Sequence, residues 1–98
     1  MINPPKVAVV ILNWNGKNFL QQFLPSVIQN SNKNAQIIVA DNASTDDSIT
    51  FLKEFYPAIK IILLEKNFGF AKGYNEALKK VDSDYYVLLN SDAEVSEG

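Results

Sequence analysis

Val7-Ala8-Val9-Val10-Ile11-Leu12 is the stretch that indicates the fold of this chain. It is a continuous apolar run, rich in β-branched residues and without hydrophobic alternation. Strands of parallel sheets are covered on both faces, and their sequences therefore read as such runs. The run ends at Asn13-Trp14-Asn15-Gly16, a polar segment that is typical of a turn. We therefore expect a buried strand that carries polar side chains at its carboxyl end.

The rest of the chain repeats this unit. Apolar runs at 36–40, 59–64 and 85–89 predict three more strands, the last of them short and buried. Apolar residues recur at helical spacing between the runs, and Pro25 is expected to kink or split the first helix. The order β-α-β-α-β-α-β with short loops predicts an α/β fold. It should have three layers, α/β/α, around a mostly parallel sheet of about four strands.

The composition of the 98 residues narrows the functional classes. A hydrophobic content of 47% argues against disorder, and a net charge of −2 without basic clusters argues against a nucleic-acid partner. There is no cysteine or histidine, so any metal would be bound by oxygen ligands. The longest apolar run is far shorter than the roughly 20 residues of a membrane span. Without a signal-peptide pattern, the expected location is the cytoplasm.

Each predicted strand ends in a polar cluster. Because the carboxyl ends of parallel strands meet at one edge of a sheet, the clusters should converge there and form a ligand site. Each cluster also fits a plain turn or a helix cap, since these residue types dominate turns. The four clusters are Asn13-Trp14-Asn15, Asp41-Asn42-Ala43-Ser44, Glu65-Lys66-Asn67 and Asn90-Ser91-Asp92.

Two further features bear on the ligand. The oxygen atoms of Asn90 and Asp92 could hold a hard divalent cation against a diphosphate. Gly73 lies inside a predicted helix, where glycine costs up to about 1 kcal/mol relative to alanine, which indicates close approach by a ligand or by another backbone. Neither a G-x-G-x-x-G nor a P-loop pattern occurs, which argues against dinucleotide-binding and P-loop proteins.

Taken together, the clusters resemble the nucleotide-binding half of a family 2 glycosyltransferase of the GT-A, Rossmann-like fold. Residues 41–46, Asp-Asn-Ala-Ser-Thr-Asp, match that family's Asp-[Asp/Asn]-x-Ser-x-Asp segment, and residues 67–75 resemble its Asn-x-Gly…Asn segment. Residues 88–92 occupy the place of its Asp-x-Asp motif. Asn13-Trp14 departs from the common Tyr-Asn pattern and is similar to a variant of rhamnosyltransferase-like branches. The resemblance covers nearly the whole chain.

The resemblance implies roles for these residues. Asp41 would meet the nucleotide base, and Asp92 with Asn90 would coordinate Mg²⁺ or Mn²⁺ on the diphosphate. Because Asn90 replaces an aspartate, one negative charge is missing and weaker metal binding is expected. The predicted nucleotide-binding residues are Asn13, Trp14, Asn15, Asp41, Asn42, Ser44, Asn67, Gly69, Gly73, Asn75, Asn90 and Ser91.

The resemblance also implies an activity: sugar transfer from a UDP-, dTDP- or GDP-sugar to an acceptor hydroxyl, inverting and metal-assisted, in polysaccharide biosynthesis. In this family the catalytic base lies beyond the metal motif, and no residue before Gly98 matches it. We therefore expect residues 1–98 to be a truncated donor-binding part that is inactive alone. A saccharide or lipid-linked acceptor would be bound by the missing part, and peripheral membrane association of the whole protein stays open.

Two alternatives remain at this point. The same framework could serve as a non-catalytic nucleotide-binding or interaction module, whose binding would survive metal chelation. A receiver-like signalling domain is the second alternative. Such domains carry an acidic pair after the first strand, where this chain has Asn13-Trp14-Asn15.

Overall fold

The computed structural model describes residues 5–31 and 35–91 of the chain. Strands and helices alternate along it, as the apolar runs predict. The elements are β1 (Val7–Asn13), α1 (Lys17–Asn30), β2 (Ala35–Asp41), α2 (Ser48–Phe55), β3 (Lys60–Leu63), α3 (Phe70–Leu78) and β4 (Tyr85–Asn90).

The four strands form one parallel sheet in the order β3-β2-β1-β4. β1 therefore pairs on both sides, and every residue from Ala8 to Asn13 is buried. The register places Asn13 opposite Asp41 of β2 and Leu12 opposite Asn90 of β4. The polar carboxyl ends of β1, β2 and β4 thus lie side by side at one edge of the sheet.

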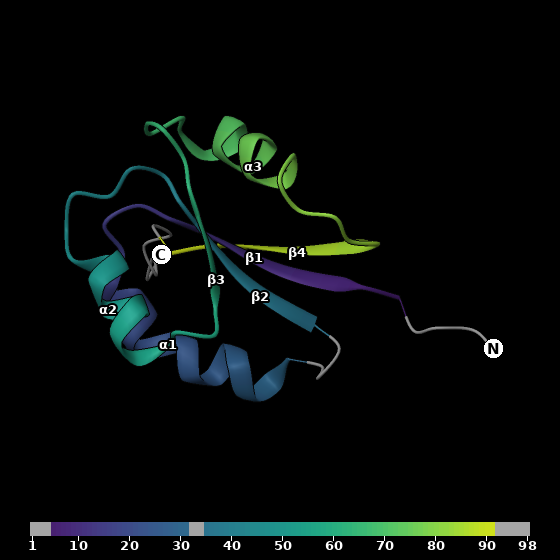
Figure 1. Ribbon diagram of the computed structural model, residues 1–98, viewed down its shortest axis with the longest axis horizontal. Coiled ribbons are helices and arrows are strands. Elements are labelled where there is room, and N and C mark those ends of the chain that lie inside the picture. Colours follow the sequence, from purple (N-terminus) through teal and green to yellow (C-terminus); the bar gives the residue numbers. More distant parts are fainter. Residues whose placement is uncertain (1–4, 32–34, 92–98) are drawn as a thin grey trace, which may run out of the picture.

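Helices cover both faces of the sheet, which confirms the three-layer architecture (Figure 1). α3 lies on one face, where Tyr74 and Ala77 belong to a core cluster with Val10 of β1. α1 and α2 lie on the other face, where Leu20 and Leu52 belong to a second cluster with β1 and β2. Since successive strand residues point to opposite faces, the continuous apolar run of β1 supplies both clusters.

The prediction that β4 is a buried strand is wrong. Its first four side chains are exposed, Tyr85 at 61% and Val87 at 46%. The reason is the position of β4 at the end of the strand order, where only β1 pairs with it among the described residues. An apolar run indicates a hydrophobic strand, but the position of that strand in the sheet decides how many of its side chains are buried.

The sequence predicts a kink or a split of the first helix at Pro25, and the split is wrong. α1 continues through Pro25 for 14 residues. Leu20 and Leu24 before the proline are buried, and Val27 after it packs against the same cluster. Packing on the sheet therefore keeps the residues on both sides of Pro25 helical, although the proline removes one backbone hydrogen bond. Within the described part of the chain, α1 included, no helix combines the length and apolarity that crossing a membrane requires.

Candidate functional site

A pocket of about 220 Å³ lies at the carboxyl edge of the sheet, on the α3 side. We call it the polar pocket, because side-chain amides and a glycine backbone contribute much of its lining. Loops and strand ends that are far apart in sequence meet there, as expected for an open parallel sheet. Its lining consists of Leu12, Trp14, Asn42, Asn67, Gly69, Phe70 and Asn90.

Asn42 fixes one wall of the polar pocket. Its Nδ2 donates to the carbonyl of Gly69 at 3.1 Å, and its Oδ1 accepts from the backbone N–H of Phe68 at 2.9 Å. Asn67 Oδ1 accepts from the N–H of Gly69 at 2.8 Å. Gly69 has a φ of +83°, a conformation that favours glycine. The loop before α3 is thereby held by two asparagines and shaped by one glycine.

Gly73 lets α3 approach the sheet at the floor of this pocket. A Cβ atom on Gly73 would lie 3.1 Å from Nδ2 of Asn42 and 3.1 Å from Cδ2 of Leu12. Both contacts are tighter than ordinary van der Waals distance. The close approach that a glycine within a helix indicates is therefore explained by these two side chains of the protein itself.

Two aromatic rings stand at the mouth of the polar pocket. Trp14 is 37% exposed, and Phe70, the first residue of α3, is 60% exposed. The Phe70 ring meets that of Tyr74 edge-on, with 5.1 Å between the centroids. Trp14 is among the predicted nucleotide-binding residues, whereas Phe70 is covered only by the segment 69–75 that the resemblance assigns to the nucleoside and diphosphate. The available signal was an aromatic residue directly after a turn glycine, at the start of a predicted helix.

Tyr74 ties α3 to the edge strand. Its hydroxyl donates to the carbonyl of Leu89 in β4. The ring is buried, and burial raises the pKa of Tyr74 to about 12. Helical spacing of apolar residues predicts Tyr74 on the buried side of the third helix, within the segment 69–75. Its polar contact depends on β4 lying beside β1, which local patterning does not reveal.

Four predicted site residues are bound to one another on the opposite side of the strand ends. Asn13 is fully buried, and its Nδ2 donates to Oδ1 of Asp41 at 2.8 Å. Its Oδ1 accepts from the hydroxyl of Ser91 at 2.6 Å. Asp41 also accepts from the N–H and hydroxyl of Ser44, at 2.8 and 2.6 Å. We call these four residues the buried network; none of them lines the polar pocket.

Asn15 joins the loop after β1 to the loop after β2. Its Oδ1 accepts from the N–H groups of Thr45 and Asp46, at 2.7 and 3.0 Å. Lys17, the first residue of α1, forms an ion pair of 2.9 Å with Asp47, the residue before α2, and the hydrogen bond between them lowers the pKa of Asp47. Asn15 therefore holds these two loops together, whereas Asn13 belongs to the buried network.

The predicted site residues therefore occupy different places. Asn75 is exposed on α3 and is not part of the pocket lining. Asp92 lies outside the described residues. Five of the predicted residues line the polar pocket: Trp14, Asn42, Asn67, Gly69 and Asn90. Six others lie outside its lining and make contacts within the protein: Asn13, Asn15, Asp41, Ser44, Gly73 and Ser91.

The described residues contain no group of three or more acidic side chains that could hold a metal ion. Asn90 lines the polar pocket, and its amide oxygen is a donor of the kind that Mg²⁺ and Mn²⁺ accept. The chemistry of this donor fits a hard cation, although an amide contributes no charge. The second predicted ligand, Asp92, lies beyond the described part.

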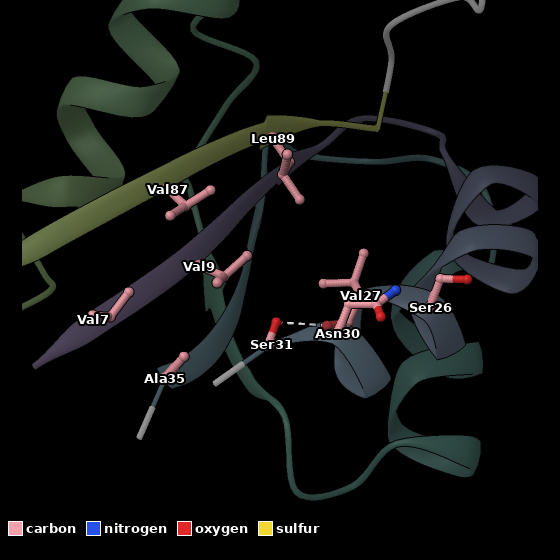
Figure 2. Close-up of a pocket in the computed structure, with 9 residues that line it drawn as sticks. All are labelled: Val7, Val9, Ser26, Val27, Asn30, Ser31, Ala35, Val87 and Leu89. Carbon is pink, nitrogen blue, oxygen red and sulfur yellow. Dashed lines mark hydrogen bonds between the residues drawn. The ribbon is translucent and has the colours of Figure 1, made fainter. Parts of the chain in front are cut away.

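A larger hollow of about 460 Å³ lies between α1 and the opposite, amino-terminal half of the strands. Figure 2 shows Val9, Val27 and Leu89 around it. Aliphatic side chains form most of its wall, which includes the first residues of β1 and β2, Val7 and Ala35. In open parallel sheets ligands bind outside the carboxyl ends of the strands, so the smaller polar pocket is the better candidate site.

Comparisons with known proteins agree on the family and on the fold of this chain. The family model described as Glycosyl transferase family 2 matches residues 8–98. TuaG of Bacillus subtilis, a glycosyltransferase named for teichuronic acid biosynthesis, is 29% identical over 91 residues. That alignment covers 90% of this chain but 36% of TuaG. The chain therefore spans about a third of this relative.

Solved structures agree with this assignment. The crystal structure of S. aureus TarS 1-349 in complex with UDP-GlcNAc matches with a TM-score of 0.74 and 25% identity, over 89% of this chain and 26% of the TarS 1-349 chain. A mannosyltransferase from Pyrobaculum calidifontis, solved with GDP-Man and Mn²⁺, matches with a TM-score of 0.73 and 22% identity, over 93% of this chain and 28% of that chain. The second likeness concerns the fold alone.

Proposed function

This chain belongs to glycosyl transferase family 2, and we propose that residues 1–98 bind the nucleotide part of a sugar donor. The observation that carries the proposal is the polar pocket, in which amide side chains and two exposed aromatic rings meet at the carboxyl edge of a parallel sheet. A nucleoside offers both chemistries, a flat base for stacking and polar edges for hydrogen bonding. The family match excludes the receiver-like alternative.

The wall formed by the start of α3 suits the diphosphate. Gly69 and Phe70 line the pocket, so the first, unpaired N–H groups of α3 lie next to it. Helix starts favour anions, because these N–H groups and the helix dipole both present positive charge. Lys66 and Lys72 belong to the same loop and helix, but their Nζ atoms lie 5.3 and 5.4 Å from the ring of Phe68, which does not line the polar pocket. The proposed diphosphate site therefore rests on the start of α3.

The donor class rests on the family and on the TarS complex. TarS is solved with UDP-GlcNAc, and its likeness covers most of this chain. We extend the proposal to UDP-, dTDP- or GDP-sugars as donors. Assignment to a rhamnosyltransferase-like branch stays a prediction.

In the proposed reaction these residues bind and orient the donor. Trp14 and Phe70 would hold the base, and Asn42 keeps the Asn67–Gly69 loop in place around the nucleoside. Asn90, together with the predicted ligand Asp92, would hold Mg²⁺ or Mn²⁺. A bound divalent cation stabilises the charge of a departing diphosphate. For the whole enzyme we propose inverting transfer to a saccharide or lipid-linked hydroxyl, at the cytoplasmic side.

Binding of UDP, dTDP and GDP to the 98-residue chain, each with and without Mn²⁺, tests this proposal. We expect a rise in melting temperature and amide shifts around Trp14, Asn67 and Asn90. Trp14→Ala should remove most of the effect, and Ser26→Ala on the exposed side of α1 should leave it intact. No response to any of the three nucleotides would contradict the proposal.

The metal dependence separates the proposed donor site from a non-catalytic nucleotide-binding module. In a donor site, EDTA and Asp92→Ala should each weaken nucleotide binding at least tenfold. Binding that survives both treatments would favour the non-catalytic module.

A further inference from the structure

Ser91 is the first described residue after β4, and it is anchored on the side of the sheet away from the polar pocket. Its side chain is buried, with its hydroxyl donating to Asn13 Oδ1 at 2.6 Å. Its backbone N–H donates to the carbonyl of Leu12 at 3.0 Å. The preceding residue, Asn90, lines the polar pocket. The side chains of these two successive residues thus point to opposite faces of the sheet, as strand geometry requires.

Gly16 leaves the space that Ser91 occupies. A Cβ atom on Gly16 would lie 2.4 Å from Oγ of Ser91 and 2.5 Å from Oδ1 of Asn13. It would also lie 2.8 Å from Cβ of Ser91. The φ of Gly16 is −105°, which other residues adopt readily. The need for glycine here is therefore one of space, and the atoms that would have to move belong to Ser91, directly after β4, and to Asn13, at the end of β1.

Asn13 joins three strands through one amide. Its Nδ2 donates to Asp41 at the end of β2, and its Oδ1 accepts from Ser91 after β4, while Asn13 itself ends β1. Donor and acceptor are both required, and both are buried. A leucine would lack both groups, and an aspartate would lack the donor toward Asp41.

We propose that Gly16, Asn13 and Ser91 form a latch that positions the end of β4, so that Asn90 faces the polar pocket. The three residues are positioning residues for donor binding and do not contact the donor themselves. Without the contacts of Ser91, the end of β4 could rotate or shift its register. A shift of one residue would turn the side chain of Asn90 away from the pocket and bring a neighbouring side chain into its place. The effect on donor binding rests on the proposed function; the placement of Asn90 does not.

The test uses the 98-residue chain with Ser91→Ala and Gly16→Ala, which attack the latch from its two sides. Ser26→Ala, the same chemical change on an exposed part of α1, is the control. In the free protein, both latch variants should raise hydrogen exchange of the residue 91 amide at least tenfold. They should also shift the side-chain amide signal of Asn90. Backbone amides between β1 and β2 should keep their protection in all variants.

A second measurement asks whether the latch acts through Asn90. Affinity for UDP or GDP with Mn²⁺ should fall at least fivefold in Ser91→Ala, at a temperature where the variant is folded. In an Asn90→Ala background, Ser91→Ala should cause no further loss, whereas an unrelated structural effect would be additive.

The outcomes separate the latch from the proposed function. Unchanged exchange at residue 91 and an unchanged Asn90 signal would overturn the latch, whatever the nucleotide affinity. If the wild-type chain binds neither nucleotide, the proposed function fails, and the exchange and Asn90 signals still decide the latch. Changed signals with unchanged affinity would overturn the positioning role. Should Gly16→Ala not fold, Ser91→Ala decides alone.

Discussion

Asp41 and Asn42 are neighbours in sequence, but they make their contacts on opposite sides of the sheet. Asp41 accepts hydrogen bonds from Asn13 and Ser44 in the buried network, on the side of α1 and α2. Asn42 points toward α3, where it holds the loop before that helix. The resemblance assigns both residues to nucleotide binding. In the structure, only Asn42 lines the polar pocket.

Asp41→Asn should destabilise the protein by about 2 kcal/mol, the range for hydrogen bonds to charged groups. Both oxygens of Asp41 accept hydrogen bonds, so an amide group in either orientation would direct its own N–H toward a donor. Urea unfolding measures the change. Asp82→Asn, on an exposed residue, is the matched control and should be neutral. Equal stability of both variants would contradict the role of Asp41 in the buried network.

Gly73→Ala should destabilise the fold by about 1 to 2 kcal/mol, although alanine is the better helix former. The added methyl group would press against Leu12 and Asn42, both buried. In a Leu12→Ala background the same glycine substitution should cost less, because the background change removes one of the opposing groups. A stability gain of about 1 kcal/mol in the single variant, as helix propensity alone predicts, would refute this explanation.

Alkaline pH should weaken the fold through Tyr74. Its pKa is raised to about 12, above the ordinary value of 10, so the folded state retains a proton that the unfolded state has lost. The contribution of Tyr74 to the free energy of unfolding is fully present below pH 10 and declines as the pH rises from 10 toward 12. The total is at most about 3 kcal/mol, because each pKa unit corresponds to about 1.4 kcal/mol. Tyr74→Phe should be less stable at pH 7, and its difference from wild type should shrink over this range in parallel urea titrations.

Phe70→Ala should weaken nucleotide binding by about 1 to 3 kcal/mol, the value of a base stacked on an aromatic ring. The control is Phe55→Ala, since Phe55 is 63% exposed against 60% for Phe70 and also contacts one ring, that of Phe51 at 5.4 Å. The two variants should lose similar, small amounts of stability. Isothermal titration with UDP or GDP and Mn²⁺ should then distinguish them, and equal affinities would exclude a stacking role for Phe70.

The elements of the fold could be predicted because their signals are local. The apolar run of β1 indicates a strand covered on both faces, and its residues are buried in the structure. Two local sequence signals gave wrong predictions. The run in β4 resembles that of β1, but an edge position leaves it exposed, and Pro25 breaks the helical pattern without ending α1. In both cases contacts with distant segments outweigh the local preference.

By itself, the sequence determined that polar residues would gather at the carboxyl edge of a parallel sheet, because strands and turns alternate in a regular order and each strand ends in a polar cluster. Only the tertiary structure decided which side each residue serves. Asn90 faces the polar pocket and Ser91 the buried network, because strand order, register and the space left by Gly16 place them there. Side-chain direction along a strand alternates residue by residue, and its absolute sense is fixed by pairing with distant strands.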